Sequence, residues 1–408
     1  MVSSARAAAA NGLGRLAART FRAAGRAGGI VGGRVALAVD RGSLARLAAG
    51  RTVALVSGTN GKTTTTAMLA RALRRFGPVA SNSSGANMPD GLVAALLDGR
   101  DAPTAVLEVD EAYLAEVARQ ISPQVAVLLN LSRDQLDRAG EVRRLEGLLR
   151  QAFRESAGTV VVANPDDVLV ASAALVAGRR AVWVATGGGW SADGAVCPRC
   201  GGAVRHERDR WWCSCGLRRP DPDWRLEGSR LTGPDGRWAQ LDLRVPGRMN
   251  LANAAVAVAA AATLGVPLTE AADAVGSVTQ AAGRYRTVPL AGHAVRLMLA
   301  KNPAGWTETM DLVLDPDRGL VIAVDGRQSD GRDLSWLWDV PFERLRGRRV
   351  TASGGRAADL AVRLAYAEVD CDVVEDPVAG VAGRRENAVD LVASYSCFLS
   401  AARLAGAG

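Results

Sequence analysis

The residues with the clearest chemistry form the run Gly58-Thr59-Asn60-Gly61-Lys62-Thr63-Thr64. An apolar run at Val53–Val56 precedes this loop, and a helical pattern follows it. Glycines let backbone N–H groups face phosphates, and a helix N-terminus favours negative charge. Lys62 is predicted to neutralise the β- and γ-phosphates of a nucleotide, and the Thr63 hydroxyl to bind Mg²⁺. The general phosphate-loop pattern has a glycine at the position of Val56, so this loop is a shorter variant. The alternative is a glycine-rich turn that binds nothing.

Four of the six cysteines lie within nineteen residues, at Cys197, Cys200, Cys213 and Cys215. Two closely spaced thiolate pairs complete a tetrahedron around zinc, and a fully ligated zinc of this kind is structural. The second pair has one intervening residue where two are usual, and His206 is a substitute ligand. The spacing predicts a Cys₄ zinc ribbon, and the alternative is free thiols in a loop.

A third group of polar residues lies in the last third of the chain. Asp330, Asp333 and Asp339 occur close to Trp336 and Trp338, after an apolar run that is typical of a strand. Dense acids and glycines after a strand indicate a functional loop. The alternative is a surface loop that the tryptophans anchor.

Composition excludes several other classes of protein. The chain has 408 residues, of which 48% are hydrophobic, so it is long enough for two or three folded domains. With only His206 and His293, a self-contained Ser-His-Asp or Cys-His enzyme is disfavoured. Lys62 and Lys301 are the only lysines among 50 basic residues, and both lie in loops with Gly or Asn. A compact ammonium is therefore expected to matter at these positions.

The net charge of +8 does not by itself predict a nucleic-acid partner. No long basic run stands out, and aromatics make up only 4%, too few for a base-stacking platform. The segment Ala5–Ala24 is predicted to be a solvated surface helix, with membrane contact as the alternative. No apolar stretch near the N-terminus is long enough for a signal core or a membrane span. We expect a cytoplasmic protein.

The elements that must position these residues follow an α/β pattern. Strands are expected at 53–56, 105–109, 125–129, 159–163 and 181–185, and helices at 63–76, 111–120, 141–156 and 251–264. Short buried strands alternating with helices indicate a mostly parallel sheet covered on both faces. A second pattern begins after about residue 286, with strands at 320–324, 350–352 and 371–374 and a helix at 357–366. The segment 384–404 is expected to be helical.

The phosphate loop resembles that of Mur ligases and folylpolyglutamate synthetases, which turn a carboxylate into an acyl phosphate that an amine attacks. By this resemblance, Glu108 matches the Mg²⁺-binding glutamate, Asn250 and Asn253 lie at the adenine, and Arg284 lies near the phosphates. The segment Asn130–Arg138 also resembles a family motif, with Gln135 in place of a histidine. Met249 likewise replaces a histidine, and these two changes disfavour a standard amino-acid-adding Mur ligase. Read without the resemblance, Glu108 pairs with an arginine, and the two asparagines cap a helix.

The cysteine cluster, the segment Lys301–Gly305 and the acidic loop together resemble the MurT family, the ATP-using subunits of lipid II isoglutaminyl synthases. The resemblance covers about residues 40 to 400. It implies a Mur ligase-like central domain over 41–286 with a ribbon inserted at about 190–220, a C-terminal α/β domain over 287–408, and an N-terminal segment over 1–40. It also implies a glutamine amidotransferase partner whose catalytic triad takes its acid from the acidic loop. Asp333 is the first choice for that acid, Asp330 the second, and Asp339 is also considered.

The predicted activity is ATP- and Mg²⁺-dependent amidation of the D-glutamate α-carboxylate of lipid II, a step of peptidoglycan synthesis, with ammonia from the partner. We expect a heterodimer that is peripheral to the cytoplasmic membrane through its substrate and binds no nucleic acid. One alternative is a stand-alone ligase that joins an amino acid to a carboxylate. Another is a non-enzymatic ATP-binding scaffold, which the intact Lys62, Thr63 and Glu108 disfavour.

Overall fold

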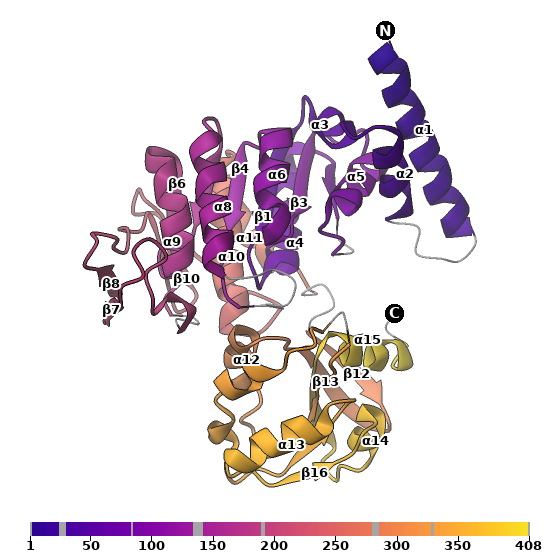
Figure 1. Ribbon diagram of the computed structural model, residues 1–408, viewed down its shortest axis with the longest axis vertical. Helices are drawn as coiled ribbons and strands as arrows, with labels where there is room; N and C mark the ends of the chain where they lie inside the picture. The colour runs from indigo at the N-terminus through magenta and orange to yellow at the C-terminus, as the bar shows by residue number, and fades with distance from the viewer. Residues whose placement is uncertain are drawn as a thin grey trace. The chain divides into compact units, whose positions relative to one another are not determined.

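The computed structural model describes residues 2–23, 30–82, 85–133, 142–188, 192–279, 285–327 and 330–406 (Figure 1). Two compact units are formed. The first holds residues 1–131 and 142–282, and the second holds residues 132–141 and 283–408. Each unit has its own sheet and its own hydrophobic core.

The first unit is built on a nine-stranded sheet in the order β11-β10-β9-β6-β5-β4-β1-β3-β2. Its strands from β6 to β2 all pair in parallel, and only β9, β10 and β11 pair antiparallel. The bounds are β1 (Thr52–Ser57), β2 (Val79–Ser81), β3 (Thr104–Glu108), β4 (Val125–Leu128), β5 (Val160–Ala163), β6 (Ala181–Ala185), β9 (Trp224–Glu227), β10 (Arg230–Thr232) and β11 (Trp238–Gln240).

Helices cover both faces of this sheet, so its strands are apolar on both sides. In β1, Val53 and Leu55 join one core, and Ala54 and Val56 join the other. The first face carries α3 (Ser43–Ala48), α5 (Pro89–Asp98), α6 (Glu111–Ile121), α8 (Val142–Glu155) and α9 (Val168–Ala174). The second face carries α4 (Lys62–Leu73), α10 (Arg248–Thr263) and α11 (Leu268–Gly276). The predicted parallel sheet covered on both faces is confirmed.

Two further elements extend the first unit. At the N-terminus, α1 (Val2–Ala23) packs on α2 (Val31–Val39). After β6, the chain forms a small hairpin of β7 (Val204–Glu207) and β8 (Arg210–Cys213), which carries the cysteines. Trp211 of β8 is buried, and its indole N–H donates to the carbonyl of Pro165 at 2.9 Å. The hairpin is therefore fixed to the body of the unit.

The second unit has a six-stranded sheet in the order β12-β13-β17-β14-β15-β16, parallel except for the β12–β13 hairpin. Its strands are β12 (Tyr285–Leu290), β13 (His293–Leu299), β14 (Gly319–Ala323), β15 (Val350–Ser353), β16 (Cys371–Val373) and β17 (Ala388–Ala393). One face packs on α12 (Pro303–Met310), α13 (Ala357–Tyr366) and the 3₁₀ turns η4 (Ser335–Asp339) and η5 (Phe342–Leu345). The other packs on α14 (Pro377–Ala382) and α15 (Tyr395–Leu404).

The prediction of one helix over 384–404 is wrong. This segment contains β17, which lies inside the sheet between β13 and β14, and only its end is helical, as α15. Asp390 interrupts the apolar run of β17 and weakens its strand pattern. In the structure this carboxylate is fully buried and is bonded to Arg296 and Arg318, at 2.6 and 2.7 Å. Partners distant in the sequence make the acid acceptable in a central strand.

Candidate active site

The phosphate-loop candidate follows the carboxyl end of β1 and runs directly into α4. Val56 is fully buried within the strand, so the loop itself is Gly58–Gly61. Gly58 and Gly61 have φ angles of 137° and 83°, a region that glycine adopts without a steric penalty. The strand therefore ends in a tight turn at the amino end of a helix, where backbone N–H groups favour an anion.

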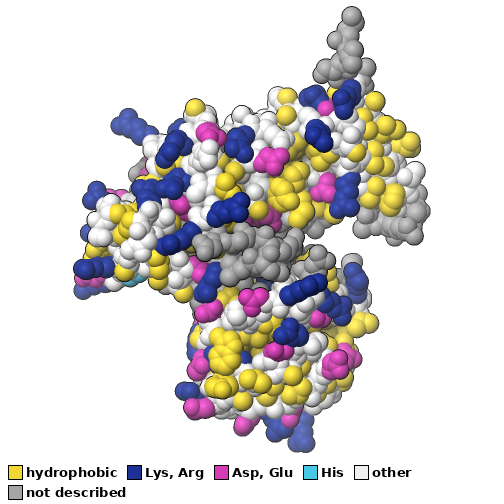
Figure 2. Space-filling model, viewed as in Figure 1, with side chains coloured by type: hydrophobic (Ala, Val, Ile, Leu, Met, Phe, Trp, Pro, Cys, Tyr) yellow, Lys and Arg dark blue, Asp and Glu magenta, His cyan; other side chains and the backbone are white. Residues whose placement is uncertain are grey.

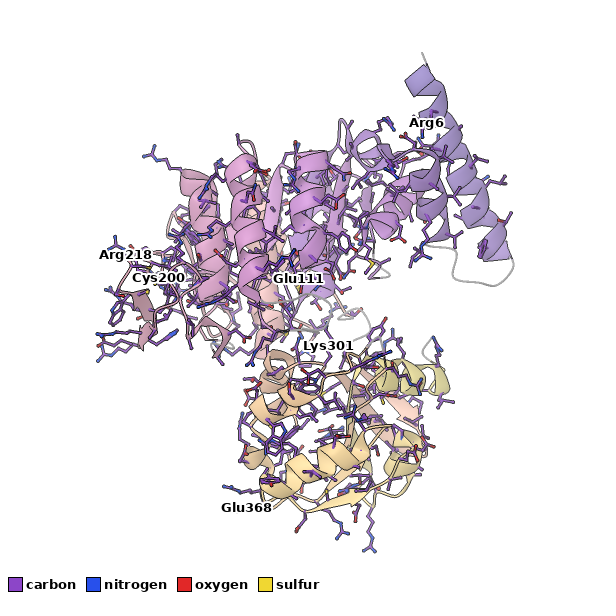
Figure 3. All side chains as sticks on the ribbon, in the orientation of Figure 1. Arg6, Glu111, Cys200, Arg218, Lys301 and Glu368 are labelled. Atoms are coloured by element: carbon purple, nitrogen blue, oxygen red, sulfur yellow. The ribbon has the colours of Figure 1, made fainter. Side chains whose placement is uncertain are left out.

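Lys62 lies inside this turn and is buried. Its ammonium donates to the carbonyls of Gly58 and Thr59, at 2.6 and 3.2 Å, and to Glu111 Oε2 at 2.9 Å. Glu111 is the first residue of α6 and is labelled in Figure 3. The acid was not among the predicted site residues, because neither spacing nor motif links it to the lysine. The loop thus holds the buried ammonium of Lys62, and Glu111 from α6 fixes the position of that ammonium.

Glu108 reaches the same edge of the sheet from β3, the parallel neighbour of β1. The strand register pairs Glu108 with Val56, two residues before the loop. The side chain is 1% exposed; Oε1 accepts from Asn87 Nδ2 at 3.1 Å, whereas Oε2 has no hydrogen-bond partner among the described residues. Within that part of the chain Glu108 pairs with no arginine. A buried carboxylate oxygen without a partner fits a cation ligand.

The two asparagines of α10 have different surroundings. Asn253 is buried against the loop: a Cβ on Gly61 would lie 2.4 Å from its Oδ1, and its Nδ2 has no hydrogen-bond partner among the described residues. Asn250 instead donates from Nδ2 to the carbonyl of Pro246 at 2.6 Å. Because α10 follows the N-cap Gly247, neither asparagine occupies the capping position. The structure brings Asn253 to the loop and leaves Asn250 in the first turn of the helix.

Asn130 belongs to the motif Asn130–Arg138, but the sequence does not predict which residues it contacts. Its Oδ1 accepts from the backbone N–H of Asn60 at 2.8 Å, and its Nδ2 donates to the Asn60 carbonyl at 3.0 Å. The Asn130 carbonyl also accepts from Thr59 N at 2.9 Å. Asn130, which follows the end of β4, therefore fixes the conformation of the phosphate loop through these three hydrogen bonds. Arg284 and Gln135 lie outside the described residues.

The three acids of the second unit differ in environment. Asp330 is 4% exposed, and its Oδ1 accepts from the backbone N–H of Ser396 in the first turn of α15, at 2.8 Å. Asp333 is exposed and accepts from the N–H and hydroxyl of Ser335, at 2.8 and 3.1 Å. Asp339 forms an ion pair with Arg133 at 3.2 Å. Of the three acids, Asp333 is thus the one whose contacts with described residues all lie in its own turn, and it is exposed to solvent.

The four cysteines of the insertion come together: their sulfurs all lie within 4.8 Å of one another. Cys200, labelled in Figure 3, is 3.4 Å from Cys213, and Cys197 is 3.7 Å from Cys215. The one-residue spacing of the second pair therefore still completes the group. A hydrogen bond from the backbone N–H of Cys215 lowers the pKa of Cys213 to about 6, which favours a thiolate at this position, whereas burial raises the pKa of Cys197. His206 is exposed on β7 and is not part of the group.

Comparisons with known proteins identify two family regions. A model of the Mur ligase middle domain matches residues 56–193, and a model of the MurT ligase C-terminal region matches residues 299–397. The lipid II isoglutaminyl synthase (glutamine-hydrolyzing) subunit MurT of Streptococcus pneumoniae strain R6 is 31% identical over 365 residues, which cover 83% of this chain and 82% of that protein. The subunit of the same name from Staphylococcus aureus strain COL is 27% identical, over 89% of this chain and 88% of that protein.

Solved structures agree in fold. MurF from Acinetobacter baumannii superposes with a TM-score of 0.68 at 18% identity, over 91% of this chain and 80% of that chain. The pseudomurein peptide ligase type C from Methanothermus fervidus gives 0.67 at 19% identity, over 87% of this chain and 78% of that chain. The predicted Mur ligase-like α/β fold is confirmed.

Proposed function

Because the chain belongs to the MurT family of Mur ligase-like proteins, we propose that it is the ATP-dependent synthetase subunit of a lipid II isoglutaminyl synthase. In this reaction the α-carboxylate of D-glutamate in the lipid II stem peptide is phosphorylated and then amidated to D-isoglutamine. The observation that carries the proposal is the convergence of Lys62, Glu108 and Asn253 on one phosphate loop.

The residues of the phosphate loop have different functions in phosphoryl transfer. Backbone N–H groups at the start of α4, from Gly61 to Thr64, bind the nucleotide phosphates, because those of Thr59 and Asn60 already donate to Asn130. Lys62 stabilises charge on the transferring phosphoryl group. To do so, its ammonium exchanges some of its present contacts with carbonyls and with Glu111 for phosphate oxygens. Glu111 thereby acts as a positioning residue for the lysine.

The metal ligands proposed here are Thr63 and Glu108 for Mg²⁺. The unpartnered Oε2 of Glu108 fits this assignment, because it gives a hard cation an oxygen that no described donor occupies. Bound Mg²⁺ would neutralise charge on the β- and γ-phosphates. Asn253, with its unpartnered amide next to Gly61, is proposed to contact the nucleotide, with Asn250 and Arg284 as further contacts. The four clustered sulfurs are proposed to hold a structural Zn²⁺.

A separate subunit is proposed to supply ammonia, and the cysteines of this chain support that division. A glutaminase needs a cysteine whose pKa is low. Burial raises the pKa of Cys397 to about 11 and also raises that of Cys371. The remaining four cysteines form the cluster. We therefore assign glutamine hydrolysis to a glutamine amidotransferase partner.

Asp333 is proposed to complete the partner's catalytic triad. An acid that orients a histidine on another subunit must present a carboxylate to that subunit. Asp333 is exposed, whereas Asp330 is buried and already accepts the N–H of Ser396. Asp339 is engaged with Arg133. The environments thus favour the first of the three predicted acids.

The deciding experiment gives the purified chain lipid II, ATP and Mg²⁺, with either ammonium chloride or glutamine as nitrogen source, and follows product mass. Amidation with ammonium but not with glutamine is expected, and adding the glutaminase subunit should restore use of glutamine. Lys62→Met should abolish both, and its melting temperature should also fall because the buried Glu111 loses its ammonium partner, so the activities are compared below that temperature. Ligation of a free amino acid without ammonium would instead identify a stand-alone ligase, and absence of carboxylate-dependent ADP release would identify a scaffold.

A further inference from the structure

The positive charge of the chain is concentrated at its N-terminus. Residues 1–51 contain nine arginines and one acid, Asp40, so they carry a net charge of +8. The whole chain also has a net charge of +8, so the other 357 residues are neutral overall. Arginines occur throughout the sequence, but acids are almost absent from this segment. Such an asymmetry points to an anionic partner for one end of the molecule.

The helix α1 has one face buried against the first unit and one face exposed to solvent. Ala10, Gly14 and Ala18 are buried, and Gly14 approaches Gly32 of α2 so closely that a Cβ on Gly14 would lie 2.7 Å from the Gly32 carbonyl oxygen. These three residues recur every four positions and so share one side of the helix. Small side chains therefore fix α1 against the first unit, and its larger side chains face outward.

The outward face combines apolar and basic side chains. Leu13 and Leu16 are 48% and 59% exposed, and Arg19 is also exposed. The described part of α1 contains no acidic residue. Figure 2 shows hydrophobic and basic side chains next to each other at this end of the first unit. A surface helix with apolar and arginine residues on one side is typical of proteins that lie on anionic membranes.

A hollow beside α1 extends this surface. It has a volume of about 740 Å³ and is lined by Arg15, Arg19 and Arg100 together with Leu16. Leu97, Asp98 and Asp101 also line it, and Asp101 pairs with Arg100 at 3.0 Å. The three arginines outnumber the two acids, and Leu16 and Leu97 form the apolar part of the lining, which suits a lipid phosphate above the first methylenes of its chains.

We infer that the outward face of α1 and the adjoining hollow bind the surface of an anionic phospholipid bilayer. No helix among the described residues is long and apolar enough to span a bilayer, so contact through this face is peripheral. The inference goes beyond the proposed reaction: it concerns the lipid surface in which a lipid-linked substrate lies, and binding requires neither ATP nor that substrate.

The test uses the full chain in flotation with phosphatidylcholine vesicles, with or without phosphatidylglycerol, and without nucleotide or lipid II. The wild type should float with the anionic vesicles, and increasing salt should weaken its binding. The double variant Arg15→Gln/Arg19→Gln should bind about 25-fold more weakly, from about fivefold per arginine near an anionic surface. The matched control Arg205→Gln/Arg210→Gln removes two exposed arginines from the β7–β8 hairpin and should bind like the wild type.

Two results would overturn the inference: no preference of the wild type for anionic vesicles, or an equal loss in both double variants. Leu16→Ser changes a single exposed side chain and should also weaken vesicle binding, which keeps the test decisive if the arginine pair disturbs folding. Amidation of a water-soluble muropeptide should be unchanged in Arg15→Gln/Arg19→Gln. Failure of vesicle binding is therefore separable from failure of the proposed reaction.

Discussion

Replacing Glu108 by Gln should stabilise the protein without nucleotide and remove its response to Mg²⁺ and ATP. The side chain is 1% exposed, and among the described residues only Oε1 is bonded, to Asn87 at 3.1 Å. Glutamine keeps the acceptor for Asn87 and puts a neutral amide where the unpartnered Oε2 lies. Burying an unsatisfied amide costs less free energy than burying an unsatisfied carboxylate.

The difference in stability between Glu108→Gln and the wild type is expected to change sign when Mg²⁺ and ATP are added. An unsatisfied buried polar group costs about 1–3 kcal/mol, and the remaining amide donor places the gain near the lower end, about 1 kcal/mol. For a unit of this size that gain corresponds to a melting temperature about 2–4 °C higher. A ligand at a hundred times its Kd stabilises the folded protein by about 2.7 kcal/mol. The wild type should therefore become more stable than Glu108→Gln once Mg²⁺ and ATP are added.

Thermal denaturation with and without Mg²⁺ and ATP measures this reversal. Glu146→Gln provides the control for the ligand shift, because Glu146 is also a 1% exposed glutamate of the first unit; unlike Glu108 it pairs with an arginine, its Oε1 lying 3.5 Å from Arg150 Nε. Glu146 lies within α8. Its variant should keep the full Mg²⁺–ATP shift. A Glu108→Gln protein that is less stable without ligand, or that retains the wild-type shift, would refute the assignment of Oε2 as a cation ligand.

Three further predictions concern the acidic loop, the phosphate loop and the cysteines. Asp333→Asn should reduce glutamine-dependent amidation by the reconstituted complex on the order of 10⁴-fold and leave ammonium-dependent amidation intact. Asp330→Ala removes the acceptor of the Ser396 N–H, so it should lower the stability by about 1–3 kcal/mol and affect both activities alike. Equal effects of the two variants would contradict the assignment. Gly61→Ala should abolish the Mg²⁺–ATP shift in melting temperature, because a φ of 83° costs a non-glycine residue about 1–2 kcal/mol and the new Cβ lies 2.4 Å from Asn253 Oδ1. Cys213→Ser should lower the zinc content measured by elemental analysis. Zinc uptake by the metal-stripped wild type should weaken as the pH falls from about 8 to about 5, because protons compete for the thiolates. Zinc uptake that is independent of pH would argue against a Cys₄ site.

The strands predicted from the sequence are found in both units, five in the first and three in the second, and the missed strands have a physical reason. The eight predicted strands are short, largely apolar runs, and each lies within one residue of its predicted ends. The strand β17 contains Asp390, whose charge is acceptable there only because Arg296 and Arg318 reach it from β13 and from the residue before β14. The hairpin β12–β13 and the short edge strands β9 to β11 also carry too little local pattern to be predicted.

The same distinction between local and distant contacts explains which site residues can be predicted from the sequence. Lys62 and Thr63 are recognisable because a phosphate loop is a local structure, made by consecutive backbone groups. Glu111 and Asn130 are not, because their part depends on β1, β3 and β4 being neighbours in the sheet. Only that arrangement brings an acid 49 residues away to the lysine, and an amide 70 residues away to Asn60.

The acidic loop shows how tertiary contacts give different properties to residues that are equivalent in the sequence. Asp330, Asp333 and Asp339 lie within ten residues in one polar stretch, and spacing alone cannot rank them as a donor of a triad acid. In the fold, α15 begins beside Asp330 and takes its carboxylate, and Arg133 takes that of Asp339. Within the described part of the chain, Asp333 is bonded only in its own turn, through Ser335, and it is exposed. A carboxylate that acts on a second protein must be held in position by its own chain and still be accessible, and of the three acids Asp333 best meets both conditions.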